Sequence, residues 1–354
     1  MILDSSLRYA DFSLSDDDAA IIEAFGKFFQ AECPTSRVRA SEPLGFDRDL
    51  WVGVAGMGAA SMGLPDELGD RASLLHLCFV SECGGQRLAP LPFAEVVAAS
   101  RLLSQCSFDD DIAAIIESVR AGTSILSLAL FPIGDSPRQL VPAGAVADHV
   151  IALRGEELLL LPSTGQGLAR NLGKSPLAWW DLAAPQTATR SLVSGPRAVA
   201  LYHHAVAEWH ILTAAALVGL SKGALDLAVD FAKGRQAFGK AIGAFQAISH
   251  PLVDLAIAVD SARNLARKAA WFSDNERDNA IDFALLAFVN AARAAIKAAG
   301  VGIHTQGGFG YTLDSDMTLY FSRAKAWSVV GGDPTRKLTT VVQSIAARRT
   351  HAHP

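Results

Sequence analysis

Apolar residues at helical spacing dominate the N-terminal third of the chain. Ala19, Ile22, Phe25 and Phe29 lie three or four residues apart, behind Ser15 and an aspartate run that favours a helix N-terminus. Further helical patterns follow and are interrupted by the prolines between residues 88 and 93. The expected helices cover residues 13–33, 47–57, 73–87, 94–104 and 109–121. We therefore predict a helical domain over residues 1–121.

The pattern changes between residue 123 and about residue 196. Short apolar runs there are bounded by glycine, proline, serine and aspartate, which is typical of β-strands. The runs cover residues 124–130, 149–153 and 157–161. We predict a small middle β-domain over residues 122–197. The adjacent Trp179 and Trp180 are interpreted as packing residues, one in the core and one at the surface; the alternative is that they form part of a ligand-facing wall.

The helical pattern returns from about residue 196 and continues nearly to the last residue. The expected helices cover residues 199–233, 245–272, 277–300, 315–327 and 334–348. Long antiparallel helices with short turns form up-and-down bundles. The predicted fold class is mainly α with a small β-domain: an N-terminal helical domain, a middle β-domain and a C-terminal four-helix bundle over residues 198–350. Gly219 and Gly223 are predicted to mark close helix contacts.

Composition narrows the functional classes. Half of the 354 residues are hydrophobic, and the net charge of −5 comes without a long run of like charge, so no nucleic-acid surface is expected. The four cysteines have no metal-binding spacing and are expected to be reduced and buried, as in a cytoplasmic protein. His203, His204 and His210 lack neighbouring ligands and are expected to face solvent or an interface. No signal peptide and no membrane insertion are predicted.

Two short segments of the C-terminal part carry candidate binding residues. The first holds Arg235, Phe238 and Gln246 in a basic, glycine-punctuated turn between helices, where arginine and a helix N-terminus suit a phosphate group. The second, QGGFGYT at residues 306–312, has paired glycines that let a backbone come close to a ligand. Each also fits a plain structural role, as helix capping or as a helix C-terminus.

Together and in this order, the two segments resemble the C-terminal domain of the flavin-dependent acyl-CoA dehydrogenases. The family pattern R-x-x-F-G-x-x-I-x-x-x-Q is matched from Arg235 to Gln246. The pattern Q-x-x-G-G-x-G-Y/F-T is matched by residues 307–312, with His304 at the family's glutamine position and Gln306 two residues later. A LYRDAK-like helix follows at residues 319–325. The resemblance covers about residues 199–349; the middle domain lacks the family's T-E-P-x-x-G-S-D loop and W-I-T/S strand.

The resemblance implies a cofactor, a reaction and partners. The cofactor is FAD, the substrate is an acyl-CoA thioester and the reaction is α,β-dehydrogenation within lipid metabolism, such as β-oxidation. The family forms homo- or hetero-tetramers in which these segments embrace the FAD of a neighbouring subunit, and an electron-transfer protein is a further partner. The implied cofactor-binding residues are Arg235, Phe238, Gln246, His304, Gln306, Gly307 and Gly308. The shortened β-domain leaves retention of FAD open.

The catalytic base is missing from its expected positions. In most of the family it is a glutamate just after the LYRDAK-like helix, and counting from that helix places the position on Gly331. A minority of the family carries the glutamate on the first long helix of the bundle, which corresponds here to Trp209. Glu208 is one residue away, or about 100° around a helix. Asp333 is the other carboxylate nearby, although it also fits an N-cap. The catalytic residue is therefore left unassigned.

Three interpretations follow. The length, the weak β-domain and Gly331 are similar to the shorter, base-less subunits of heteromeric acyl-CoA dehydrogenases, including those that act on steroid side-chain CoA esters. In this interpretation the chain is a non-catalytic subunit that completes a partner's flavin site. The second interpretation is a scaffold or binding protein on a degenerate dehydrogenase fold. The third keeps the flavin but changes the reaction to that of an acyl-CoA oxidase or flavin monooxygenase.

Overall fold

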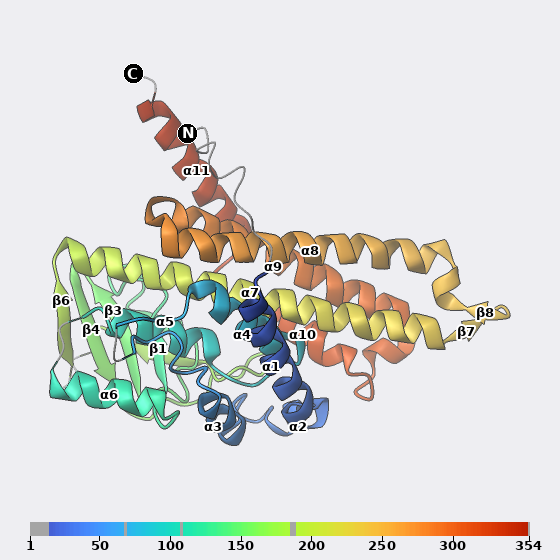
Figure 1. Cartoon of the computed structure of the whole chain (residues 1–354), viewed down its shortest axis with the longest axis horizontal. Helices are drawn as coiled ribbons and strands as arrows, with labels where there is room; N and C mark the ends of the chain where they lie inside the picture. Colours follow the sequence, from blue (N-terminus) through green and yellow to red (C-terminus); the bar gives the residue numbers. More distant parts are fainter. Residues whose placement is uncertain (1–13, 67–68, 107–108, 185–188, 353–354) are drawn as a thin grey trace.

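The N-terminal helices pack against one side of a long central helix, α7 (Pro196–Gly234). The computed structural model describes residues 14–66, 69–106, 109–184 and 189–352 (Figure 1). Ser15, Asp47, Ser73 and Asp109 each accept a backbone N–H at a helix start, which is why the helices begin there. The helices of this part are α1 (Asp16–Glu32), α2 (Thr35–Ala40), α3 (Arg48–Gly56), α4 (Leu74–Gln86), α5 (Phe93–Leu103) and α6 (Asp110–Arg120).

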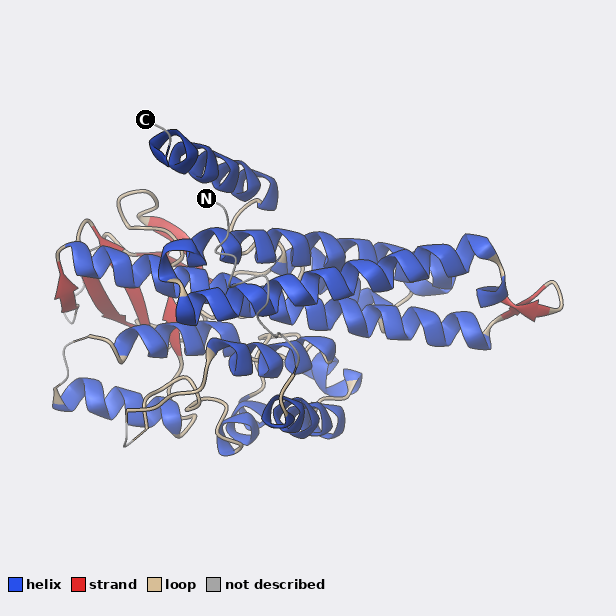
Figure 2. Cartoon of the chain, turned by 45° about the horizontal axis from the view of Figure 1, so that its top comes forward, coloured by secondary structure: helices blue, strands red, loops and turns tan. Residues whose placement is uncertain are grey.

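The middle part forms two small sheets at one end of the molecule (Figure 2). The larger sheet has the order β1-β3-β4-β6, with β1 parallel to β3 and the other pairs antiparallel, and the smaller one pairs β2 with β5. Trp180 is buried and Trp179 is exposed on β5, as alternation along a strand requires. The strands are β1 (Leu126–Leu128), β2 (Arg138–Val141), β3 (His149–Arg154), β4 (Glu157–Pro162), β5 (Ala178–Asp181) and β6 (Arg190–Ser194).

The C-terminal part is a bundle of long helices around α7. A hairpin, β7 (Gln236–Ala237) and β8 (Lys240–Ala241), joins α7 to α8 at one tip of the molecule (Figure 1). The remaining helices are α8 (Gln246–Asn275), α9 (Arg277–Gln306), α10 (Met317–Trp327) and α11 (Pro334–Ala352). The predicted fold class, mainly α with a small β part, is confirmed.

Helix α9 is longer than the sequence pattern predicted. It continues past Gly300 to Gln306, because the next glycine serves packing instead of ending the helix. A Cβ added at Gly302 would lie 2.4 Å from Cε of Met317 on α10. The same logic holds at Gly219 on α7, where a Cβ would lie 2.0 Å from the carbonyl oxygen of Glu82 on α4. The predicted close contact at Gly219 is therefore present.

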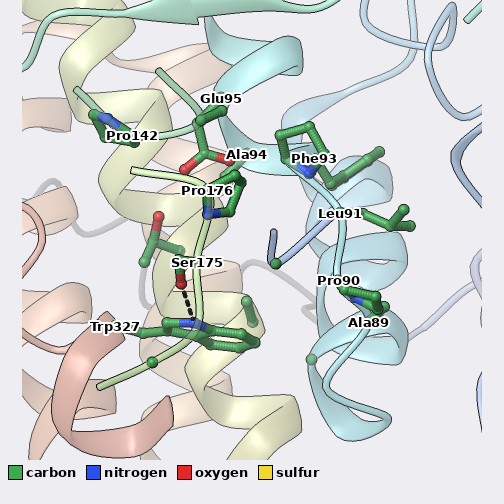
Figure 3. Close-up of a pocket in the computed structure, with 18 of the residues that line it drawn as sticks. Ala89, Pro90, Leu91, Phe93, Ala94, Glu95, Pro142, Ser175, Pro176 and Trp327 are labelled. Carbon is green, nitrogen blue, oxygen red and sulfur yellow. Dashed lines mark hydrogen bonds between the residues drawn. The ribbon is translucent and has the colours of Figure 1, made fainter. Parts of the chain in front are cut away.

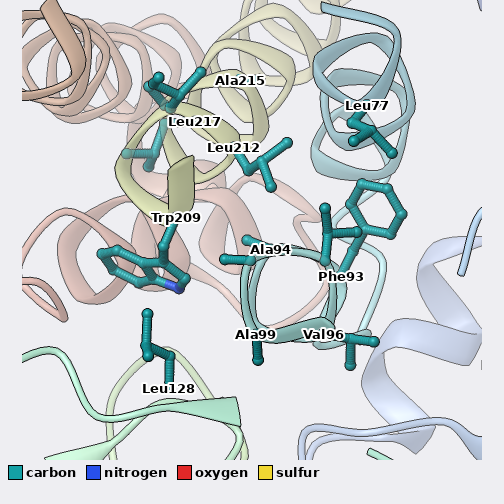
Figure 4. Close-up of a cluster of buried hydrophobic side chains, with 14 of the residues drawn as sticks. Leu77, Phe93, Ala94, Val96, Ala99, Leu128, Trp209, Leu212, Ala215 and Leu217 are labelled. Carbon is teal, nitrogen blue, oxygen red and sulfur yellow. The ribbon is translucent and has the colours of Figure 1, made fainter. Parts of the chain in front are cut away.

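The buried core runs continuously from the N-terminal helices into the bundle. Trp209 and Leu212 on α7 face α4 and α5, with Phe93 and Leu77 across from them (Figure 4). All four cysteines are free and buried, and burial raises the pKa of the Cys33 thiol to about 12. Two helical segments, Pro196–Gly234 and Ala280–Tyr311, are long and apolar enough to cross a membrane, but 78% and 56% of their apolar windows are buried within the fold.

Candidate functional site

The arginine segment forms an exposed hairpin at the tip of the bundle. Arg235 follows the last turn of α7 and Gln246 is the first residue of α8, and both are exposed. Between them, Phe238 (φ 52°) and Gly239 (φ 77°) have positive φ, as the tight turn of a two-residue hairpin requires. Glycine adopts this conformation freely, whereas phenylalanine does so at a cost of about 1–2 kcal/mol. The Phe238 side chain is nevertheless 94% exposed, so the hairpin displays an aromatic ring to its surroundings.

The glycine segment lies at the end of α9, where Gly307 (φ 61°) ends the helix. Added Cβ atoms at Gly307 and Gly308 would meet nothing within 4 Å, so the backbone is open to an approaching group. His304 is exposed one turn earlier on α9. Gln306 differs from the other predicted contacts, because it is buried and its Oε1 accepts a hydrogen bond from Ser315. Its side chain is therefore not presented on this surface.

The tertiary structure brings the two segments to the same end of the bundle. Phe231 in the last turn of α7 stacks on Phe309 in the glycine segment, with ring centroids 6.2 Å apart and planes 8° apart. We call this the bundle-end surface; it comprises Arg235, Phe238, Gln246, His304, Gly307 and Gly308. The arginine and glycine segments thus lie at the same end of the bundle within one chain, and most of their residues are exposed.

The two positions expected for a catalytic base meet elsewhere, in the interior. A Cβ added at Gly331 would lie 2.7 Å from Cζ3 of Trp209 and 3.1 Å from Nε2 of His210. The indole of Trp209 therefore fills the space that a side chain at position 331 would need. Neither position carries a carboxylate, and Trp209 blocks position 331 from carrying one without repacking.

Glu208 is not available as a catalytic base, because its carboxylate forms a buried ion pair. The single Nε–H of Arg101 is shared between both carboxylate oxygens of Glu208, at N···O distances of 3.0 and 3.1 Å, and both side chains are 1% exposed. Its Oε1 also lies 3.3 Å from Nε2 of His204. Burial by itself would raise the pKa of Glu208, but Arg101 and His204 outweigh it and lower that pKa to about 2. A carboxylate so firmly paired is a poor proton acceptor.

Two other sequence-based interpretations can be compared with the structure. Asp333 is exposed and accepts the backbone N–H of Thr335 at the start of α11, so it acts as the predicted cap. The expectation that the histidines face solvent or an interface is wrong for two of them, since His204 and His210 are buried. Burial, with the nearby charge of Lys337, lowers the pKa of His210 to about 3. The error arises because α7 is buried around most of its circumference, so polar residues such as these histidines are buried with their apolar neighbours.

A cavity of about 120 Å³ opens beside Trp209 (Figure 3). Its walls come from α4, α5, α7, α10 and the loop before β5. The lining residues include Val80, Ala94, Pro142, Pro176, Trp209 and Trp327.

Glu95 is the carboxyl group of this cavity, and sequence reasoning missed it. It lies half-buried on α5, and its Oε1 accepts a hydrogen bond of 3.0 Å from Nε1 of Trp209. Burial raises the pKa of Glu95, while the Trp209 hydrogen bond opposes the rise. No described residue forms an ion pair with it. The sequence did contain a signal for this residue, because Glu95 is the one acidic residue within the largely apolar run from Phe93 to Leu103.

Comparisons with known proteins agree with the resemblance. Residues 203–346 match the family model described as "Acyl-CoA dehydrogenase, C-terminal domain". The chain is 27% identical to the acyl-CoA dehydrogenase IpdE2 of Mycolicibacterium smegmatis, over 92% of this chain and 97% of that protein. It is 25% identical to benzylmalonyl-CoA dehydrogenase of Aromatoleum aromaticum, over 94% and 98% of the two chains.

Solved structures show the same fold. A chain of the ChsE4-ChsE5 complex from Mycobacterium tuberculosis superposes with a TM-score of 0.84 at 24% identity, over 95% of this chain and 99% of that chain. Glutaryl-coenzyme A dehydrogenase in its glutaryl-CoA complex gives a TM-score of 0.84 at 17% identity, over 96% and 97%. With the bundle and the glycine segment in place, residues 203–346 are assigned to the acyl-CoA dehydrogenase C-terminal domain, and the chain as a whole is similar to acyl-CoA dehydrogenases, oxidoreductases that act on acyl-CoA.

Proposed function

We propose that this chain is a subunit of an FAD-dependent acyl-CoA dehydrogenase and that its bundle-end surface completes the flavin site of a neighbouring subunit. The observation that carries the proposal is the stacking of Phe231 on Phe309, which places the arginine and glycine segments at one exposed end. The surface would thus reach a nucleotide held by another subunit. One of the structural relatives is a chain of the ChsE4-ChsE5 complex, and this similarity supports such an assembly.

The residues of the bundle-end surface suit FAD. Arg235 offers a planar fork of donors to a pyrophosphate, and Gln246 opens α8 with backbone N–H groups and a favourable dipole. Phe238 can cover an aromatic ring system, and the strain of its positive φ is typical of binding sites. The glycines at 307 and 308 let the backbone come close to the dinucleotide. Bound FAD would supply the hydride acceptor for the dehydrogenation.

We further propose that this chain is the non-catalytic member of a heteromer. The support is steric and electrostatic: position 331 has no side chain, Trp209 fills the adjoining space, and Glu208 is held by Arg101. The base would come from a glutamate-bearing subunit, in a cytoplasmic assembly that acts on an acyl-CoA and passes electrons to an acceptor protein. The competing functions are those of a scaffold or binding protein on a degenerate dehydrogenase fold and of an acyl-CoA oxidase or flavin monooxygenase.

The test is the visible flavin absorbance of the chain purified alone and together with a glutamate-bearing family member from the same genome. We expect flavin and dehydrogenase activity with the partner and little of either without it. Arg235→Ala should weaken FAD binding by the assembly about tenfold or more, since a charge-assisted hydrogen bond is worth about 1.5–3 kcal/mol. Lys233→Ala, an exposed cation two residues away on α7, is the matched control and should leave binding unchanged.

Each competing function has its own signature. Absence of flavin with every partner, with no effect of Arg235→Ala on assembly, would favour the scaffold. Oxygen consumption on an acyl-CoA would favour the oxidase or monooxygenase. Full activity of the isolated chain with FAD would refute the non-catalytic role.

A further inference from the structure

The first turn of α11 carries a lysine that the proposed function does not use. Lys337 lies half-buried where α11 begins at the bundle, whereas the later turns of this helix extend away from it (Figure 1). Its ammonium nitrogen lies over the ring of Phe288 on α9, 5.9 Å from the centroid. Within the described part of the chain, it forms no ion pair with a carboxylate. This amine is therefore held against apolar surface without a counter-charge, although an ammonium group favours water or an anion.

The turn that precedes α11 leaves one side of this amine uncovered. A Cβ added at Gly332 would lie 3.9 Å from Nζ of Lys337 and 3.7 Å from Cζ of Phe131, so both groups border the space that a side chain at position 332 would occupy. Gly331, the preceding residue, also lacks a side chain. Because neither glycine covers Nζ, a reagent can approach the amine along this turn, beside the ring of Phe131.

The titratable groups near Lys337 provide no free negative charge. On α7, burial and the lysine charge lower the pKa of His210 to about 3, so this imidazole is neutral. Asp333 caps the start of α11, Asp282 on α9 accepts a hydrogen bond from a serine farther along α11, and Arg336 is exposed. With no carboxylate to stabilise the ammonium form, burial lowers the pKa of Lys337 from 10.5 to about 8.

We propose that Lys337 is a self-acylation site, at which the amine takes an acyl group directly from an acyl-CoA thioester. A lysine desolvated by apolar surroundings is an activated nucleophile. The neutral Nζ attacks the thioester carbonyl carbon, a C–N bond forms and the C–S bond breaks. The nitrogen loses one proton and the departing thiolate gains one, so the products are an amide on Lys337 and free CoA thiol. The balance requires no oxidant and no further reactant.

This inference rests on the proposed function for its acyl donor, because a subunit of an acyl-CoA dehydrogenase works among such thioesters. At pH 7.5, about 24% of an amine with a pKa of about 8 is neutral, against about 0.1% of an amine with a pKa of 10.5. A less basic nucleophile is intrinsically weaker, which offsets part of this gain and leaves an expected advantage of about tenfold or more over an exposed lysine. Acylation also removes the charge that burial disfavours, so the fold accommodates the product.

The test incubates the full chain, without FAD or a partner, with acetyl-CoA and measures the initial acetylation rate of each lysine by peptide mass spectrometry. At pH 7.5 we expect the rate at Lys337 to exceed that at Lys297, an exposed lysine on α9, by about tenfold or more. The rate at Lys337 should rise through about pH 8 and level off above about pH 9, where its amine is neutral. The measurement involves no flavin, so its failure is separate from failure of the flavin proposal.

Variants separate activation by the surroundings from chance modification. Phe131→Ser admits water to the ammonium group and should slow acetylation of Lys337 toward the rate at Lys297. Val342→Ala, at a side chain of α11 that is 59% exposed, is the matched control and should leave the rate unchanged. Lys337→Arg should remove this modification and leave the other lysines unaffected. The proposal is overturned if Lys337 reacts no faster than Lys297, if its rate keeps rising beyond about pH 10, or if Phe131→Ser does not slow the reaction.

Discussion

Replacing Glu208 by glutamine tests whether this carboxylate stabilises the fold or performs chemistry. The change keeps the shape and removes a charge that pairs with Arg101 at 1% exposure of both side chains. A pKa of about 2, against an ordinary 4.5, corresponds to about 3 kcal/mol at neutral pH, at about 1.4 kcal/mol per unit. Loss of one member of a buried ion pair costs a similar 3–5 kcal/mol, because the remaining charge is left uncompensated. We expect Glu208→Gln to lose about 3 kcal/mol of unfolding free energy.

Urea denaturation at a series of pH values measures this loss. The pKa of Glu208 is depressed in the fold, so its contribution is complete above about pH 4.5 and is lost as the pH falls toward about 2. The variant should therefore differ most from the parent near neutral pH, and the difference should shrink below pH 4.5. Glu23→Gln breaks an exposed pair with Lys27 and should leave stability unchanged at every pH. A Glu208→Gln protein that keeps its stability but loses dehydrogenase activity in the assembled enzyme would refute the structural role.

Three further predictions follow from the same contacts. Gly331→Ala should destabilise the fold by about 1–3 kcal/mol in thermal unfolding, because its Cβ would lie 2.7 Å from Trp209; unchanged stability would mean that this region repacks freely. For the same reason, Gly331→Glu should not give the isolated chain dehydrogenase activity, which an acyl-CoA-dependent dye-reduction assay can check. Lys337→Met should raise the melting temperature at pH 7, because burial lowers the pKa of Lys337 to about 8 and disfavours its charged form. That gain should disappear above about pH 10.5, where the lysine is neutral in the unfolded chain as well; a gain that does not depend on pH would point to packing instead.

The sequence determined the class of fold and the bundle-end surface. Helical periodicity and caps such as Ser15 and Asp109 are local signals, and the helices begin where those residues satisfy backbone N–H groups. Arg235 and Gly307 could be located because a tight turn and a helix end impose residue types at fixed spacing. The assignment of particular residues to FAD, and the domain boundaries at residues 121 and 197, stay predictions.

The strands were harder to predict from the sequence. Short runs such as Arg138–Val141 and Arg190–Ser194 carry few apolar residues, and what makes them strands is the partner strand alongside. β-Propensity depends on such neighbours, so it is weak evidence before the pairing is known. Helix α9 was underestimated for a related reason, since Gly302 serves contact with Met317 on another helix.

Only the tertiary structure decided the interior of the site. Counting residues placed the missing base at Gly331 or Trp209, but their packing against each other depends on how α7 meets the turn after α10. The pairing of Glu208 with Arg101 joins residues 107 positions apart, and the hydrogen bond from Trp209 to Glu95 joins residues 114 apart. The pattern of residues along a chain shows which face of a helix is apolar. The packing of the elements against one another decides which polar groups lie opposite each other. The environment of Glu95 in the cavity depends on this packing.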